Sequence, residues 1–271
     1  MRNITPGNLQ KLNDRPTACR KRHRVLILAV VAIAMYSGAS LSLAERTQGE
    51  ATKEHTMANE PSLTTRQQTI APIAAFAAVG DMAGLDAALN KGLDAGLSVS
   101  EAKEILVQLY AYAGFPRSLN ALGQLMKVVE ARRQHGIQDL PGREPSHAIP
   151  TGDALLAAGT ANQTELAGAP VKGPLFDFAP AIDRFLKTHL FGDIFERNNL
   201  DWQSRELATV GALAALSGVE SQLQAHIRIS LNTGLSVAQL RQLATVLNET
   251  GNSEAGSRVQ AALDKLPAKA N

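Results

Sequence analysis

The chain has 271 residues, of which 45% are hydrophobic and only 4% are aromatic. Alanine and leucine supply most of the apolar content, which argues against a β-rich core and favours helices packed on helices. The formal charge of +2 arises in the first 44 residues, since the remainder carries 20 Lys and Arg against 24 Asp and Glu. A mildly acidic body of this kind argues against nucleic acid as a partner.

Residues 1–44 have the layout of a secretory signal peptide. A basic cluster at residues 20–24 precedes an apolar run at 25–35, and small residues follow up to Ala44. We therefore expect cleavage after Ala44, a periplasmic or secreted protein, and no membrane contact after cleavage. The alternative is a retained anchor, because residues 25–44 are long enough to span a bilayer.

Cys19 lies inside this leader and is the single cysteine of the chain. The mature protein would therefore have no thiol for a disulfide, a nucleophile or a metal. The segment that follows the leader, residues 45–62, is polar and is expected to be disordered.

Two parts of the chain match at a constant offset of 138 residues. The sequence Gly-Leu-Ser-Val at residues 96–99 recurs at 234–237, and the same offset pairs Gly80 with Gly218. Further matches keep this register over about 40 residues without a gap. The chain is therefore expected to contain two diverged copies of one unit.

Helical spacing of apolar residues dominates both copies, and no stretch alternates as a strand would. Gly96 suits a left-handed helix end. Ser98 with Glu101, and Ser236 with Gln239, have the spacing of capping boxes. We expect helices at residues 67–79, 82–95, 98–112, 118–134, 179–195, 205–217, 219–233, 237–248 and 254–265.

These patterns predict an all-α protein with a first domain at residues 63–135 and a second at 176–267. The stretch 136–175 is rich in Gly, Pro, Ser and Thr and is expected to be a linker. The pair Phe115-Pro116 is expected to end a helix, because proline disfavours helical backbone in the residue before it.

Four segments carry a recognisable pattern: Glu-Ile-Leu-Val-Gln-Leu-Tyr-Ala-Tyr-Ala-Gly-Phe-Pro at 104–116, Leu-Phe-Gly-Asp-Ile-Phe-Glu-Arg at 190–197, Arg-Glu-Leu-Ala-Thr-Val at 205–210 and Ala-His-Ile at 225–227. Together they resemble the carboxymuconolactone decarboxylase family. The resemblance covers about residues 63–265. It implies a tandem member with two AhpD-like helical units, which would assemble with further copies of itself as a trimer with pseudo-hexameric symmetry.

The family contains two chemistries, and one of them does not fit these residues. Thiol-based peroxide reduction uses a Cys-x-x-Cys pair just before the histidine. The corresponding positions are Val219 and Gln222 in the second copy, and Asp81 and Gly84 in the first. Without sulfur at these positions thiol peroxidase activity is not expected, and decarboxylation of a lactone remains.

Decarboxylation requires that a carboxylate is held and that a proton is supplied to carbon. By the resemblance, His226 and Glu206 are the expected catalytic pair, since histidine and glutamate can relay protons near neutral pH. Arginine can clamp a carboxylate through two hydrogen bonds. The residues expected to bind the substrate are Arg205, Arg197, Glu104 and Tyr112.

The two copies have lost opposite halves of this pattern. The first copy has glutamine and alanine at the positions of Glu206 and His226, and the second has glutamine and threonine at those of Glu104 and Tyr112. We therefore expect a composite site, in which His226 and Glu206 meet Glu104 or Tyr112 across the interface between the copies.

The expected function is an exported protein that acts on or binds a small carboxylated or lactone compound, with no cofactor. A metal site is not expected, because His226, His189 and Glu206 lack the usual ligand spacing. The alternative is a non-catalytic binding or assembly module that keeps only the fold, with His226 as a hydrogen-bonded core residue. Export favours this alternative, since lactone catabolism is expected in the cytoplasm.

Overall fold

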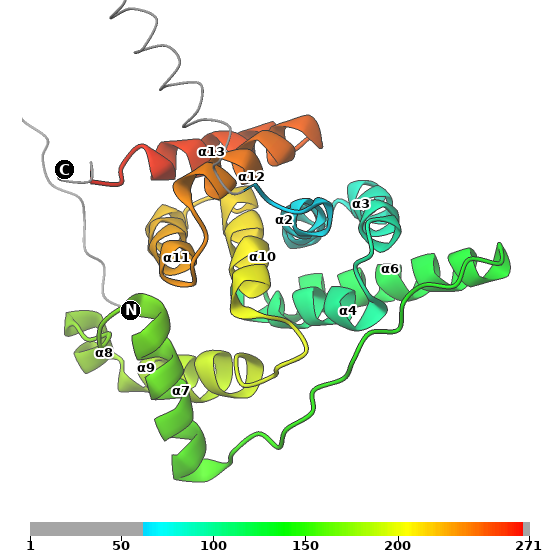
Figure 1. Ribbon diagram of the computed structural model, residues 1–271. Helices are drawn as coiled ribbons and strands as arrows, with labels where there is room; N and C mark the ends of the chain where they lie inside the picture. Colours follow the sequence, from blue (N-terminus) through cyan, green and yellow to red (C-terminus); the bar gives the residue numbers. More distant parts are fainter. Residues whose placement is uncertain (1–61, 268–271) are drawn as a thin grey trace, which may run out of the picture. The chain divides into compact units, whose positions relative to one another are not determined.

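The computed structural model describes residues 62–267 (Figure 1). Within that range the backbone forms helices, turns and loops, and no residue belongs to a strand. The predicted all-α class is therefore confirmed. No helix in residues 62–267 is long and apolar enough to cross a bilayer. The expected leader, residues 1–44, and residues 45–61 of the polar segment lie outside the described residues.

The first copy begins with a helix that is well defined at both ends. Thr64 and Gln67 form a capping box before the first turn, and Gly80 closes the helix with φ of 76°. Ser98 and Glu101 form the predicted box at a later helix. The helices of this copy are α2 (Thr65–Val79), α3 (Met82–Asp94), α4 (Val99–Gln108), α5 (Tyr110–Ala113) and α6 (Phe115–Gln134).

Two expectations in this copy need correction. The helix predicted at residues 98–112 is interrupted at Leu109 and continues as the short α5. Phe115 and Pro116 do not merely end a helix, because they begin α6. Proline is tolerated in a first turn, where its missing N–H would have no helical partner.

The stretch predicted to be a linker contains a long helix. α7 (Gly152–Ala167) is followed by α8 (Pro174–Phe178), α9 (Pro180–Phe185) and the π-helix η1 (Leu186–Ile194). α7 packs closely against η1, since a Cβ atom at Gly159 would collide with the carbonyl oxygen of Lys187. Gly159 therefore allows the two helices to approach closely.

The second copy repeats the first in structure. Its helices are α10 (Trp202–Ala215), α11 (Glu220–Asn232), α12 (Val237–Glu249) and α13 (Ser253–Leu263). α11, α12 and α13 each begin 138 residues after α3, α4 and α6. Asp201 accepts a hydrogen bond from the backbone of Ser204, so α10 begins three residues earlier than predicted.

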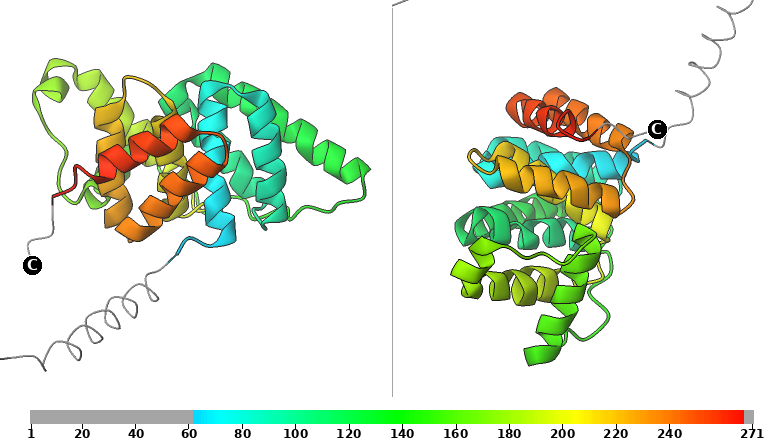
Figure 2. Two further views of the ribbon diagram at one scale, coloured as in Figure 1. Left: turned by 90° about the horizontal axis from the view of Figure 1, so that it is seen from above. Right: turned by 90° about the vertical axis from the view of Figure 1, so that its left-hand side faces the viewer.

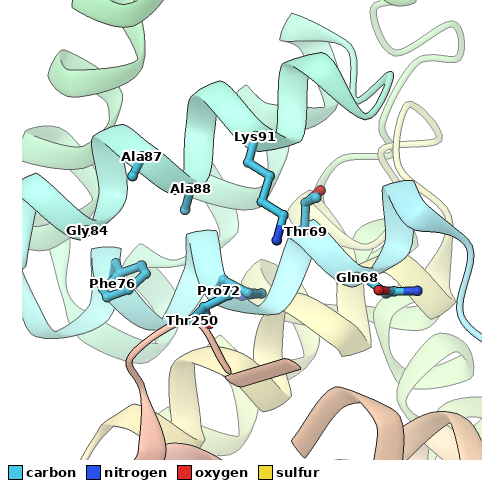
Figure 3. Close-up of a pocket in the computed structure, with 9 residues that line it drawn as sticks. All are labelled: Gln68, Thr69, Pro72, Phe76, Gly84, Ala87, Ala88, Lys91 and Thr250. Carbon is cyan, nitrogen blue, oxygen red and sulfur yellow. The ribbon is translucent and has the colours of Figure 1, made fainter. Parts of the chain in front are cut away.

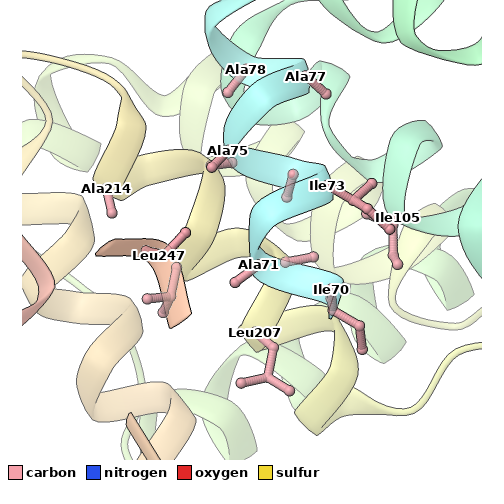
Figure 4. Packing of buried hydrophobic residues seen from close by; sticks show 14 of the residues in the cluster. Ile70, Ala71, Ile73, Ala75, Ala77, Ala78, Ile105, Leu207, Ala214 and Leu247 are labelled. Carbon is pink, nitrogen blue, oxygen red and sulfur yellow. The ribbon is translucent and has the colours of Figure 1, made fainter. Parts of the chain in front are cut away.

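α2 and α10 pack against one another in the core, and Figure 2 shows α12 and α13 lying across them. Ile70 and Ala71 of α2 meet Leu207 of α10 and Leu247 of α12 in one apolar cluster (Figure 4). The α2 and α10 backbones approach closely at Gly211, where a Cβ atom would lie 2.8 Å from the Cα atom of Ala71. The two copies therefore share one hydrophobic core.

Candidate active site

Glu206 and His226 form a buried pair between α10 and α11. His226 Nδ1 lies 2.8 Å from Glu206 Oε2. The glutamate side chain is fully buried and the histidine side chain is 10% exposed. A carboxylate accepts but does not donate, so Nδ1 carries the proton of this bond and Nε2 is the ring nitrogen left without this contact. The predicted pair is thus in direct contact.

Tyr112 of the first copy packs against this pair. Its ring meets the His226 ring edge to face, with centroids 5.5 Å apart and an interplanar angle of 83°. Within residues 62–267 neither the Tyr112 hydroxyl nor Glu206 Oε1 has a hydrogen-bond partner, although both atoms are buried. Burial, together with the nearby negative charge of Glu206, raises the pKa of Tyr112. The Tyr112 phenol therefore stays protonated, with its ring packed against the imidazole.

Glu104, from α4 of the first copy, lies in a separate ion cluster. Arg197 donates to its two carboxylate oxygens at 2.8 and 2.9 Å, and Arg205 donates to Oε1 at 2.9 Å. The side chains of Glu104 and Arg205 are almost completely buried, and that of Arg197 is 30% exposed. The two arginines therefore hold an internal carboxylate.

Further polar contacts complete this cluster. Asn199 donates to Glu104, and Gln108 accepts from Arg205 and donates to its backbone carbonyl. Burial raises the pKa of Glu104, but the hydrogen bonds from Arg197 and the charge of Arg205 outweigh it, so this pKa is lower than usual. Burial lowers the pKa of Arg205. The guanidinium groups of the two arginines already pair with Glu104. Their predicted substrate-binding role stays a prediction.

Sequence reasoning identified some of these residues and missed others. It paired Glu206 with His226 and expected Tyr112 or Glu104 to join them; the structure brings Tyr112 to His226, and joins Glu104 to the arginines. Gln108 was missed, although it lies four residues after Glu104 on the same helix face. Asn199 lies outside the helices, where no periodic pattern indicates it.

His189 does not join the site. Its Nδ1 lies 2.6 Å from Asp193 Oδ2, four residues along the same π-helix. Among the described residues, no three His, Cys, Asp or Glu side chains are grouped as a metal site would require.

Comparison with known proteins gives the site a context. The model of the carboxymuconolactone decarboxylase family matches residues 49–126 and again 180–265. A 4-carboxymuconolactone decarboxylase from Acinetobacter baylyi is 32% identical over 69 residues, which are 26% of this chain and 51% of that protein. The match thus spans about half the length of this relative. Because the family model covers more than half of the chain in two segments, the protein belongs to the carboxymuconolactone decarboxylase family.

Proposed function

We propose that this is an exported protein in which His226 and Glu206 carry out proton transfer on a small carboxylated lactone. The observation that carries the proposal is the contact of three side chains from the two repeats. Glu206 orients the imidazole through Nδ1, and the ring of Tyr112 packs against the same imidazole. A base, its orienting carboxylate and a neutral donor are the groups that acid–base chemistry at carbon requires.

Each group has a separate task in a decarboxylation. As the C–C bond to the carboxylate breaks, CO2 leaves and its bonding electron pair passes into the conjugated lactone carbonyl. The Tyr112 hydroxyl stabilises the developing charge on oxygen. His226, which has taken up a proton from water at Nε2, then delivers that proton to the carbon that lost CO2 and returns to neutral imidazole. The carboxylate of Glu206 stabilises the imidazolium form of His226 before the transfer.

The ion cluster acts on this site through the backbone. Arg205 directly precedes Glu206 on α10, and its guanidinium is held by Glu104 and Gln108 of α4. α4 belongs to the first copy, which also supplies Tyr112. These bonds therefore hold the first turns of α10, which carry Glu206, against the first copy. We assign Glu104, Arg197 and Arg205 as positioning residues.

A non-catalytic binding module is the second candidate. It is favoured by the loss of the histidine and the acidic residue from the first copy, where Ala88 and Gln68 stand instead. A protein that has lost one site can have retained the other for binding alone. The two candidates differ in turnover and agree that His226 contacts the ligand.

The test is a thermal-shift screen of the purified protein against small carboxylated lactones, followed by a CO2-release assay with each hit. A ligand that binds the native state raises the melting temperature. We expect His226→Gln to abolish the shift. His189→Gln is the matched control, because it alters another His–carboxylate pair outside the site.

Three outcomes separate the alternatives. A shift with CO2 release, both lost in His226→Gln, supports the decarboxylase. A His226-dependent shift without turnover supports the binding module. A shift that His226→Gln leaves unchanged would place the ligand elsewhere and contradict both candidates.

A further inference from the structure

A pocket lies in the first copy, between α2 and α3. It has a volume of about 240 Å³ (Figure 3). Pro72 and Phe76 of α2 and Ala88 of α3 contribute apolar surface, and Thr250 at the end of α12 reaches it from the second copy. The lining residues are Gln68, Thr69, Pro72, Phe76, Gly84, Ala87, Ala88, Lys91 and Thr250.

The repeat relates this pocket to the candidate active site. With the offset of 138 residues, Gln68 corresponds to Glu206, Ala88 to His226 and Thr250 to Tyr112. The pocket is thus the counterpart of the His226 site. Alanine and threonine there replace an imidazole and a phenol ring, so the side chains at these two positions are smaller than in the other half of the protein.

Lys91 adds a group that the His226 site lacks, since Ile229 occupies the corresponding position. Its side chain is exposed and extends toward α2 between Thr69 and Pro72 (Figure 3). Across residues 62–267, no carboxylate lies within 4.0 Å of its ammonium group. The ammonium therefore remains available to a ligand.

The other polar side chains of the pocket already donate hydrogen bonds within the protein. The hydroxyls of Thr69 and Thr250 donate to backbone carbonyls of their own helices. The side-chain nitrogen of Gln68 donates to the carbonyl of Leu63. The pocket therefore offers one cation beside a mainly apolar wall.

We propose that this pocket binds a small carboxylate that carries a single aromatic ring. A cavity of about 150 Å³ suffices for benzene, so the larger pocket here has room for a ring and its carboxylate. The ring would lie on Pro72, Phe76 and Ala88, and the carboxylate would pair with Lys91. This second site is independent of His226 and of the reaction proposed for it.

The test uses 4-fluorobenzoate as the probe, with its dissociation constant measured by fluorine NMR on the purified protein. Ala88→Leu fills the pocket and is expected to weaken binding by roughly tenfold or more. Lys91→Gln is expected to weaken it about twofold to fivefold, as is usual for a partly exposed ion pair. Lys127→Gln, at another exposed lysine, is the charge control and should change nothing.

Two controls test whether the probe binds through its charge and in this pocket: a neutral ligand, and a variant at the His226 site. 4-Fluorobenzamide should bind wild type and Lys91→Gln equally, because it has no charge to pair. His226→Gln should leave binding of 4-fluorobenzoate unchanged. The proposal is overturned if wild type does not bind the probe, which is also the result expected if another segment or copy fills the pocket. It is equally overturned if Ala88→Leu binds as wild type does, or if His226→Gln alone abolishes binding.

Discussion

His226 and Tyr112 lie in edge-to-face contact although they come from different copies of the repeat. Tyr112 lies on the short α5 of the first copy, and His226 lies on α11 of the second. Each copy alone therefore holds only part of the site. The contact of these side chains thus depends on the packing of the two copies around their shared core.

Replacing Tyr112 by phenylalanine should separate catalysis from stability. The phenol hydroxyl is buried without a partner in the described part of the chain, and such a group costs about 1–3 kcal/mol of desolvation. We expect Tyr112→Phe to melt at the same or a higher temperature than wild type. Turnover should fall about 100-fold, the lower range for loss of an acid–base group.

Tyr110→Phe is the matched control for that variant. Its hydroxyl is also buried without a partner among the described residues, but its ring stacks on Phe115 and is not in the His226 site. Its thermal behaviour should resemble that of Tyr112→Phe while turnover stays at the wild-type level. Equal activity of both variants would show that Tyr112 only packs against the histidine.

The sequence was sufficient to predict the helices with clear end signals. The boxes at Ser98 and Ser236 place the starts of α4 and α12 correctly, because capping is a local interaction between residues three apart. The pairing of Glu206 with His226 was also predicted, through the resemblance. The constant offset indicated that both copies have the same helices.

The remaining features depend on tertiary contacts that no local pattern records. The Gly, Pro, Ser and Thr content of residues 136–175 suggested a linker, but Gly159 in this stretch permits the close approach of α7 to η1. The pairing of Glu104 with Arg205 requires that α4 and α10 lie together, which follows from how the copies share their core. A free arginine and one engaged by a buried carboxylate look the same in sequence.

Glu104→Gln tests the ion cluster. Removal of one partner from a buried pair leaves uncompensated charge and costs about 3–5 kcal/mol, so a large loss in the free energy of unfolding at neutral pH is expected. Chemical denaturation followed by circular dichroism measures this loss. The control is Glu130→Gln, which removes an exposed pair with Arg133 and should leave stability unchanged.

The stabilisation that Glu104 provides should also depend on pH. The pKa of Glu104 is lower in the folded protein than its ordinary value of 4.5. Its contribution is therefore fully present above pH 4.5 and is lost as the pH falls through the lower, folded-state pKa. The stability difference between wild type and Glu104→Gln should thus narrow in acid. A constant difference from pH 7 to pH 3 would contradict a charged role for Glu104.

Self-association is expected to use the exposed face of α6. Phe115, Leu119 and Met126 are 61%, 62% and 69% exposed and lie on one stripe of this helix. Large exposed apolar residues in a stripe are typical of an interface. We expect the wild type to be a trimer by light scattering, and Leu119→Lys combined with Met126→Lys to be a monomer.

A charge placed on another face of α6 controls for that result. Asn120→Lys alters an exposed residue outside the stripe and should keep the mass of the wild type. If wild type is a monomer, or if the double variant keeps the wild-type mass, the α6 stripe is not the interface.

Gly211→Ala tests the helix crossing on which the composite site depends. A methyl group at this position would collide with the backbone of Ala71 on α2 and would force α2 and α10 apart. Overpacking of this kind costs about 1–3 kcal/mol, and separation of the helices should also displace Glu206. Gly123→Ala is the control, since a Cβ atom there meets no other atom within 4 Å and alanine favours helix over glycine by about 1 kcal/mol. Urea unfolding should therefore show opposite changes for the two variants. A Gly211→Ala protein as stable and active as wild type would mean that the site does not need so close an approach of the two copies.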